Sequence, residues 1–190
     1  IDHRRELNNT MSTLHVENLK GPTSGANANT IIVPSGQSFS APGHVVQVGH
    51  TYNHQVSAHQ TIASTSLVGS GVTCTLTPLS TNNKFIISWT VSMVYGGNNS
   101  SFCSGAMKYK IGSGSYNFVD GANDTAGVPY NIGYNNVGAT YAPMTSTHEV
   151  DITSASAYTF EPHYKSGNGS SSVWCHIRAG YSLLVMEIAG

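Results

Sequence analysis

Hydrophobic and polar side chains alternate one by one along much of the chain after residue 44. In the longest run, Phe85–Tyr95, every odd position is apolar or aromatic, while Ser88, Thr90 and Ser92 stand at even positions. Shorter alternating runs cover residues 72–77, 107–111, 158–165 and 173–179. A period of two places successive side chains on opposite faces of a β-strand, so each run predicts a strand with one buried face.

The last run, Tyr181–Ile188, differs because it is apolar at most positions on both faces. Such a strand is typical of the centre of a sheet or of a contact with a partner subunit. Turn clusters rich in Gly, Asn and Ser separate the runs, for example at residues 69–71 and 96–99, and no segment has helical periodicity. About eight to ten short strands at this spacing predict an all-β fold. We expect residues 44–190 to form an antiparallel β-sandwich, a jelly-roll-like head domain.

The first 43 residues are predicted to form a separate, extended segment. Six of the 17 charged residues lie within the first 20 positions, and residues 21–43 are rich in Gly, Pro, Ser and Asn. Their short β-branched run, residues 30–33, has no core of its own and needs neighbouring chains. We therefore expect residues 1–43 to be an N-terminal extension and a stalk or attachment segment. A flexible linker is the alternative.

Charge is scarce throughout the chain. Charged residues make up 9% of it and the formal net charge is −1, against about 25% charged residues in a typical soluble domain. Such a surface lacks the clustered basic face that binds nucleic acid, and it favours self-association, so we expect a homo-oligomer and no nucleic acid. No apolar run approaches the ~20 residues of a membrane helix, so no membrane insertion is expected. The three cysteines predict no disulfide framework.

Patterns for catalysis and metal binding are weak. His50 and His54 would lie about 13 Å apart on one strand face, too far for one metal ion unless three chains each contribute one His at an axis. Glu149 and Asp151 share a strand face at about 6–7 Å, which suits a glycosidase pair. A solvated strand face explains the two acids equally well. We expect no enzymatic activity, no cofactor and no metal.

The Tyr-rich stretch of residues 112–147 is the predicted contact surface. Its Gly and Asn content indicates loops, and Tyr has a flat apolar face and a polar edge that suit contacts with sugars and proteins. The candidate receptor-binding residues are Tyr116, Phe118, Tyr130, Tyr134, Asn135 and Tyr141. The alternative is that some of these Tyr cap the open end of the sandwich.

Four segments carry a family resemblance: MSTLHVENLKG (11–21), APGHVVQV (41–48), TPLSTNNKFIISWTV (77–91) and YSLLVMEIAG (181–190). With them the chain resembles the small tail-fibre or virion structural proteins of marine bacteriophages. Residues 1–10 and the Tyr-rich stretch depart from the family's pattern.

The resemblance implies a thin N-terminal region that attaches to other virion tail proteins and a β-rich, homotrimeric head. It places the protein in the virion, as a tail-fibre tip that binds a host cell-surface glycan or an outer-membrane protein. Two other functions stay open. A depolymerase of surface polysaccharide would use Glu149 and Asp151, and a virion decoration protein would bind no receptor.

Overall fold

The computed structural model describes residues 24–25, 41–53, 60–62, 64–95, 103–119, 130–132, 140–166, 173–175 and 181–190. The chain divides into two compact units, Ile1–Phe39 and Ser40–Gly190. All described residues except 24 and 25 belong to the second unit. The predicted stalk therefore lies almost entirely outside the described residues.

The second unit is built from two antiparallel β-sheets. The first sheet consists of β1 (Val45–Asn53), β12 (Tyr181–Ile188), β5 (Lys84–Tyr95), β9 (Thr140–Asp151), β11 (Val173–Cys175) and β2 (Gln60–Ile62). The second consists of β3 (Val68–Gly69), β4 (Cys74–Leu76), β10 (Tyr158–Ser166), β6 (Cys103–Ile111), β7 (Asn117–Phe118) and β8 (Tyr130–Ile132). The described residues contain no helix, which confirms the all-β prediction.

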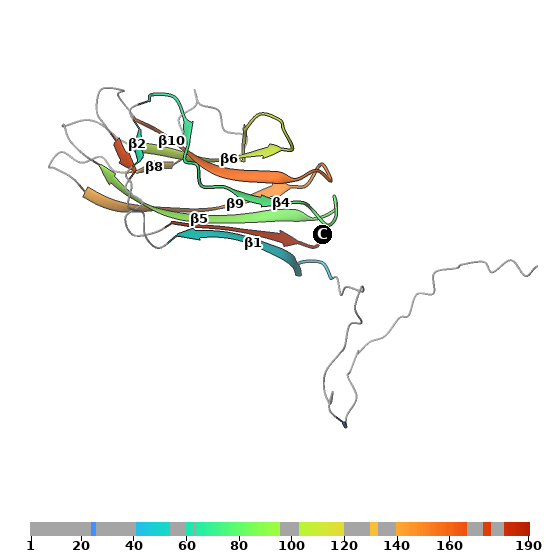
Figure 1. The fold of residues 1–190 in the computed structure, drawn as a ribbon. Helices are drawn as coiled ribbons and strands as arrows, with labels where there is room; N and C mark the ends of the chain where they lie inside the picture. The colour runs from blue at the N-terminus through green and yellow to red at the C-terminus, as the bar shows by residue number, and fades with distance from the viewer. Residues whose placement is uncertain are drawn as a thin grey trace, which may run out of the picture. The chain divides into compact units, whose positions relative to one another are not determined.

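The order of the strands is that of a jelly roll. In the first sheet β12 lies between β1 and β5, and β9 pairs with the other edge of β5. In the second sheet β10 lies between β6 and the short strands β3 and β4, and β7 and β8 pair with β6. Strands that alternate between two packed sheets in this way form two Greek keys. Figure 1 shows the two sheets as layers, with β4, β6 and β10 above β1 and β5. The predicted sandwich is confirmed.

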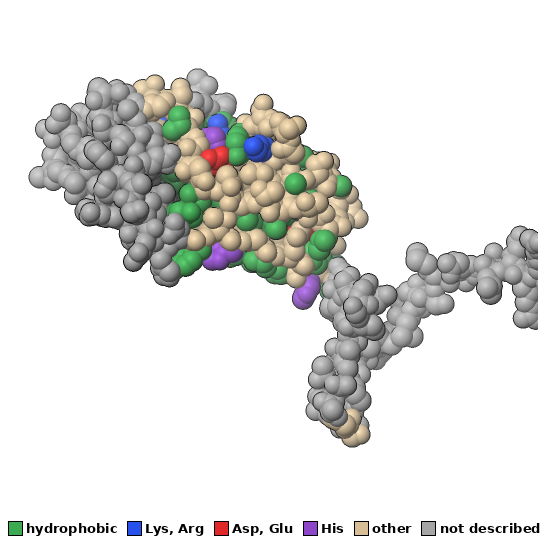
Figure 2. Space-filling model, in the orientation of Figure 1, with side chains coloured by type: hydrophobic (Ala, Val, Ile, Leu, Met, Phe, Trp, Pro, Cys, Tyr) green, Lys and Arg blue, Asp and Glu red, His purple; other side chains and the backbone are tan. Residues whose placement is uncertain are grey.

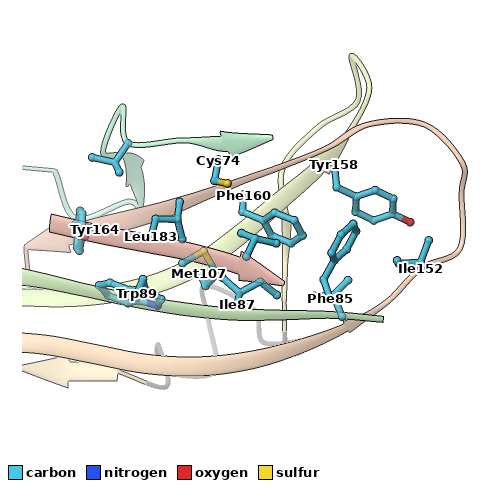
Figure 3. Packing of buried hydrophobic residues seen from close by; sticks show 13 residues of the cluster. Cys74, Phe85, Ile87, Trp89, Met107, Ile152, Tyr158, Phe160, Tyr164 and Leu183 are labelled. Atoms are coloured by element: carbon cyan, nitrogen blue, oxygen red, sulfur yellow. The ribbon is translucent and has the colours of Figure 1, made fainter. Parts of the chain in front are cut away.

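The core lies between the sheets and contains the residues that the alternating pattern selected. Phe85, Ile87 and Trp89 of β5 are each at most 1% exposed. They meet Phe160 and Tyr164 of β10, with ring centroids 5.3 Å apart for Phe85–Phe160 and 6.1 Å apart for Trp89–Tyr164, both edge to face (Figure 3). Edge-to-face pairs add about 0.5–1.5 kcal/mol to the free energy gained by burying the rings. This packing holds the two sheets together.

Strand β12 lies between β1 and β5, which confirms the predicted central position in a sheet. Leu183 and Val185 are fully buried between the sheets. Leu184, Met186 and Ile188 face the opposite side and are only partly buried. The two-sided burial expected from the apolar run is therefore complete on one face, and the other face is left half exposed.

Glu187, on the buried face of β12, fastens the turn between β4 and β5. Its carboxylate accepts hydrogen bonds from the backbone N–H groups of Leu79 (3.0 Å) and Ser80 (3.2 Å), from Asn83 Nδ2 (2.6 Å) and from Gln47 Nε2. Burial alone would raise the pKa of Glu187, but these donors outweigh it and the pKa is lowered. The side chain therefore stays ionised and fixes the turn to the end of the first sheet.

Candidate functional site

The candidate site lies on the outer face of the second sheet, where β6 and β10 pair in register. Residue Lys108 faces Glu161 across the pair, and Ala106 faces His163. Because Met107, Phe160 and Tyr164 point into the core, the intervening residues point outward. The outward positions therefore bring Lys108, Lys110, Glu161 and His163 onto one surface.

A turn after β6 returns the chain along the edge of β6. Gly112 has a φ of +54°, a left-handed conformation that glycine adopts without strain, and the Gly114 N–H donates to the Ile111 carbonyl at 3.0 Å. Strand β7 then pairs with β6, with Phe118 opposite Lys108. Tyr116 and Phe118 are thereby placed on the same outer face as the two lysines.

Each lysine lies over an aromatic ring of the returning segment. Lys108 Nζ is 4.3 Å from the centroid of the Phe118 ring, and Lys110 Nζ is 5.0 Å from that of Tyr116. Both distances are within the range of cation–π attraction. These four residues, Lys108, Lys110, Tyr116 and Phe118, are called the Lys–aromatic patch. Figure 2 shows basic, acidic, His and hydrophobic side chains gathered over β6 and β10.

Within the patch, Tyr116 is also bound to Glu161 of β10. The Tyr116 hydroxyl donates a hydrogen bond to the carboxylate, and burial together with this acceptor and its negative charge raises the pKa of Tyr116. Oxygen Oε1 of Glu161 also accepts from the Gly71 N–H at 2.8 Å. The hydroxyl thus remains protonated and ties the returning segment to the sheet.

Gly69 of β3 leaves the room that Glu161 needs. A Cβ atom at this position would lie 2.5 Å from Glu161 Oε1 and 2.9 Å from the carboxyl carbon. Since real Cβ atoms do not approach so closely, any larger residue would displace the carboxylate. The close approach of backbone and carboxylate explains a glycine within a strand.

His163 is the least satisfied group of the site. It is 8% exposed, its ring lies 4.8 Å from that of Tyr116, and neither ring nitrogen has a hydrogen-bond partner within the described structure. Its Nε2 is 3.7 Å from Glu161 Oε2, beyond hydrogen-bond distance. Burial lowers the pKa of His163, Glu161 opposes this change, and Lys108 reinforces it. The ring is therefore held neutral.

The predicted contact residues do not all lie together. The structure brings Tyr116 and Phe118 into one patch, whereas Tyr134 and Asn135 lie outside the described residues. For Tyr130 and Tyr141 only the backbone is described. Tyr130 begins β8, which pairs with β6, and Tyr141 belongs to β9 of the other sheet.

The expectation that this stretch is all loop needs correction. Phe118, Tyr130 and Tyr141 lie in strands β7, β8 and β9, because the free edges of β6 and β5 take up these segments as partners. Nor does Tyr116 cap the open end of the sandwich: it covers the outer face of the second sheet. Four residues of the site were not among the predicted contact residues, although the alternation in 107–111 and 158–165 placed them outward: Lys108, Lys110, Glu161 and His163.

The acidic pair Glu149 and Asp151 lies elsewhere, on the outer face of the first sheet. Both residues are exposed, and Glu149 Oε1 is 2.6 Å from Lys84 Nζ. Across the described ranges no group of three or more His, Cys, Asp or Glu is arranged to hold a metal ion. The described residues also include no membrane-spanning helix.

The site has a hydrogen-bonded part beneath the surface and an outer part that can contact a ligand. The polar atoms of Glu161 and Tyr116 are directed at each other and at the backbone near Gly71. The half-buried rings of Tyr116 and Phe118 can stack on a surface ligand, and the ammonium groups of Lys108 and Lys110 can donate hydrogen bonds to it. No protein-family model matches the chain, and no curated protein matches it.

Proposed function

We propose that the chain is a structural virion protein, the head of a phage tail fibre, which attaches to the host surface through the Lys–aromatic patch. The ligand in this proposal is a cell-surface glycan or an outer-membrane protein. The observation that carries it is the patch itself, two aromatic rings held on a rigid sheet with a lysine over each. Aromatic side chains with a fixed backbone bind at low entropic cost.

The jelly-roll fold supports the proposal in a general way. Jelly rolls occur in viral capsid and lectin domains as well as in cupins. Because one fold serves many functions, the fold alone does not indicate adhesion. The support for adhesion is the Lys–aromatic patch on the outer face of the second sheet. The resemblance of segments such as TPLSTNNKFIISWTV (77–91) to marine phage tail-fibre proteins is the reason for proposing the virion as the location and other tail proteins as partners of the N-terminal segment.

Homotrimerisation is part of the proposal. Copies of a chain with net charge −1 and few charged residues repel one another only weakly, so they are prone to associate. A fibre head that binds weakly through each copy also gains avidity when three copies engage one surface.

Binding of the labelled full chain to cultures of abundant marine bacteria, and to their extracted surface polysaccharides, tests the proposal. Adhesion predicts saturable binding with no change in the length of the polysaccharide. Shortening of the polysaccharide that is lost in Glu149→Gln would instead favour a depolymerase. Failure to bind any culture or extract would favour a virion decoration protein without a receptor.

A further inference from the structure

The outer face of the first sheet is mostly apolar along β1 and β12, and His50 and Ser182 form a polar pair on it at 2.9 Å. The register places Val48 beside Met186, and Met186 beside Ile86 of β5. The next row places His50 beside Leu184. These residues alternate with the buried ones, so their side chains lie on the side of the sheet that faces away from the core.

This face is exposed where a soluble surface would be polar. Val45, Val48 and Tyr52, all on β1, are 40%, 56% and 50% exposed, and they account for three of the five exposed large hydrophobic residues among those described. Figure 2 shows hydrophobic side chains along the lower margin of the molecule, on the side of β1. An apolar sheet face of this kind marks an interaction surface.

Among the described residues, the charged side chains on this face belong to β5 and β9. Lys84 of β5 and Glu149 of β9 form an ion pair at 2.6 Å, and Asp151 lies opposite Lys84. The described part of β1 and β12 contributes no charged side chain to the outer face. A surface of this composition can meet an identical surface without bringing like charges together.

The N-terminal segment of the chain enters the head at β1, the edge strand of this face. Residues 1–43 lead directly into β1 through a turn whose Gly43 N–H donates to the Ala189 carbonyl at 2.8 Å, and the Ala189 N–H donates to the His44 carbonyl at 2.8 Å. If the N-terminal segments of several chains join, β1 is the first strand after the junction.

We propose that the outer face of β1 and β12 is the interface between copies of this chain in a homotrimer, an inference that rests on the proposed fibre function. A threefold ring requires a heterologous contact, in which two different patches of neighbouring subunits meet. The β1 side of one copy, with Val48 and Tyr52, packs against the β12 side of the next, with Leu184 and Met186. Residues 1–39 of the same chain are the alternative occupant.

The test is the molar mass of the full chain by light scattering, for wild type, Val48→Glu and Thr75→Glu. Thr75 is an exposed, β-branched strand residue on the outer face of the second sheet, so it receives the same charge on the opposite side of the sandwich. We expect wild type and Thr75→Glu at about three times 20.1 kDa. Val48→Glu should keep its β-type circular dichroism and dissociate with about a tenfold or larger rise in dissociation constant, because the interface would bury an unpaired carboxylate.

Two results would overturn the assignment. A trimeric Val48→Glu at every concentration would place the interface elsewhere. A monomeric wild type would exclude the trimer, and a lower melting temperature of Val48→Glu would then assign the face to residues 1–39 of the same chain. Neither result bears on adhesion through the Lys–aromatic patch, which binding to cells and polysaccharides tests. The two proposals can therefore be refuted independently.

Discussion

Two buried titratable residues, Glu187 and His163, differ in whether their polar atoms have hydrogen-bond partners. Glu187 is fully buried, and its carboxylate has donors from Gln47, Asn83 and the backbone of the β4–β5 turn. His163 is nearly as buried, and its two nitrogens have no partner among the described residues. Since an unsatisfied buried polar group costs about 1–3 kcal/mol, His163 is a local weak point beneath the Lys–aromatic patch.

Replacing His163 by Phe should stabilise the protein, and more so in mild acid. Phe retains a ring beside Tyr116 and removes both unpaired nitrogens. The folded state of the wild type has a lowered His163 pKa, so below the unfolded pKa of about 6.5 the unfolded chain binds a proton that the folded chain does not. Stability of the wild type should therefore fall as pH drops from about 7 toward the folded pKa, and this part of the loss should vanish in the variant.

Urea unfolding at a fixed protein concentration, at about pH 7 and about pH 5, measures this difference. Tyr116→Phe is the matched control, because it removes the hydroxyl that Glu161 accepts from and leaves His163 in place. It should lower stability by about 1 kcal/mol at both pH values. An equal stability gap between wild type and His163→Phe at both pH values would contradict the account of His163.

Among the strands, β5 has a central place in the sandwich. It pairs with β12 on one edge and with β9 on the other, and its inward residues fill the centre of the core. Trp89 is 1% exposed, and its Nε1 donates to His148 Nε2 at 3.4 Å. The sequence pattern alone placed this ring inward.

Trp89→Ala should lower the free energy of unfolding by about 3–5 kcal/mol, because it leaves a large cavity between the sheets. Thr90→Ala is the control: Thr90 is exposed on the opposite face and exchanges a hydrogen bond with Thr145 at 2.6 Å. Its loss should cost less than about 1 kcal/mol. Thermal unfolding followed by circular dichroism compares the two, and similar melting temperatures would show that the ring at 89 does not support the core.

Much of this element structure follows from the sequence because a strand has a fixed period. The alternating runs at 85–95, 107–111 and 158–165 became β5, β6 and β10, with the predicted apolar faces inward. The same period could not show what covers the other face. Glu161 and His163 are buried on the outward side of β10 because the segment around Tyr116 returns over them. That contact joins residues far apart in sequence.

The candidate site was predictable in part for the same reason. Tyr116 and Phe118 stood out as aromatic residues in a Gly-rich stretch. Lys108 and Lys110 appeared as ordinary outward residues of a strand, and their role as partners of the rings depends on the β6–β7 register. Pairings such as β1 with β12, between the two ends of the head, likewise have no local signal in the sequence.

For the whole molecule, the jelly roll places the two proposed surfaces on opposite sides. The Lys–aromatic patch lies on the outer face of the second sheet, and the apolar face of β1 and β12 lies on the outer face of the first. In the proposed trimer the first sheets face the threefold axis, so the three patches point away from it. One architecture then accommodates both assembly and attachment.

Whether the Lys–aromatic patch is the attachment surface is tested by adsorption of the labelled full chain to a marine bacterium that it binds, compared for wild type, Phe118→Ala and Thr75→Ala. Phe118 is half-buried in β7, whereas Thr75 lies outside the patch on the same outer face, separated from Lys110 by Thr159 of β10. Loss of one stacking ring corresponds to about 0.5–1.5 kcal/mol for each copy, up to about a tenfold weaker affinity. We expect this loss for Phe118→Ala, wild-type adsorption for Thr75→Ala, and unchanged molar mass and melting temperature for both. Equal adsorption of all three proteins would show that the Lys–aromatic patch is not the attachment surface.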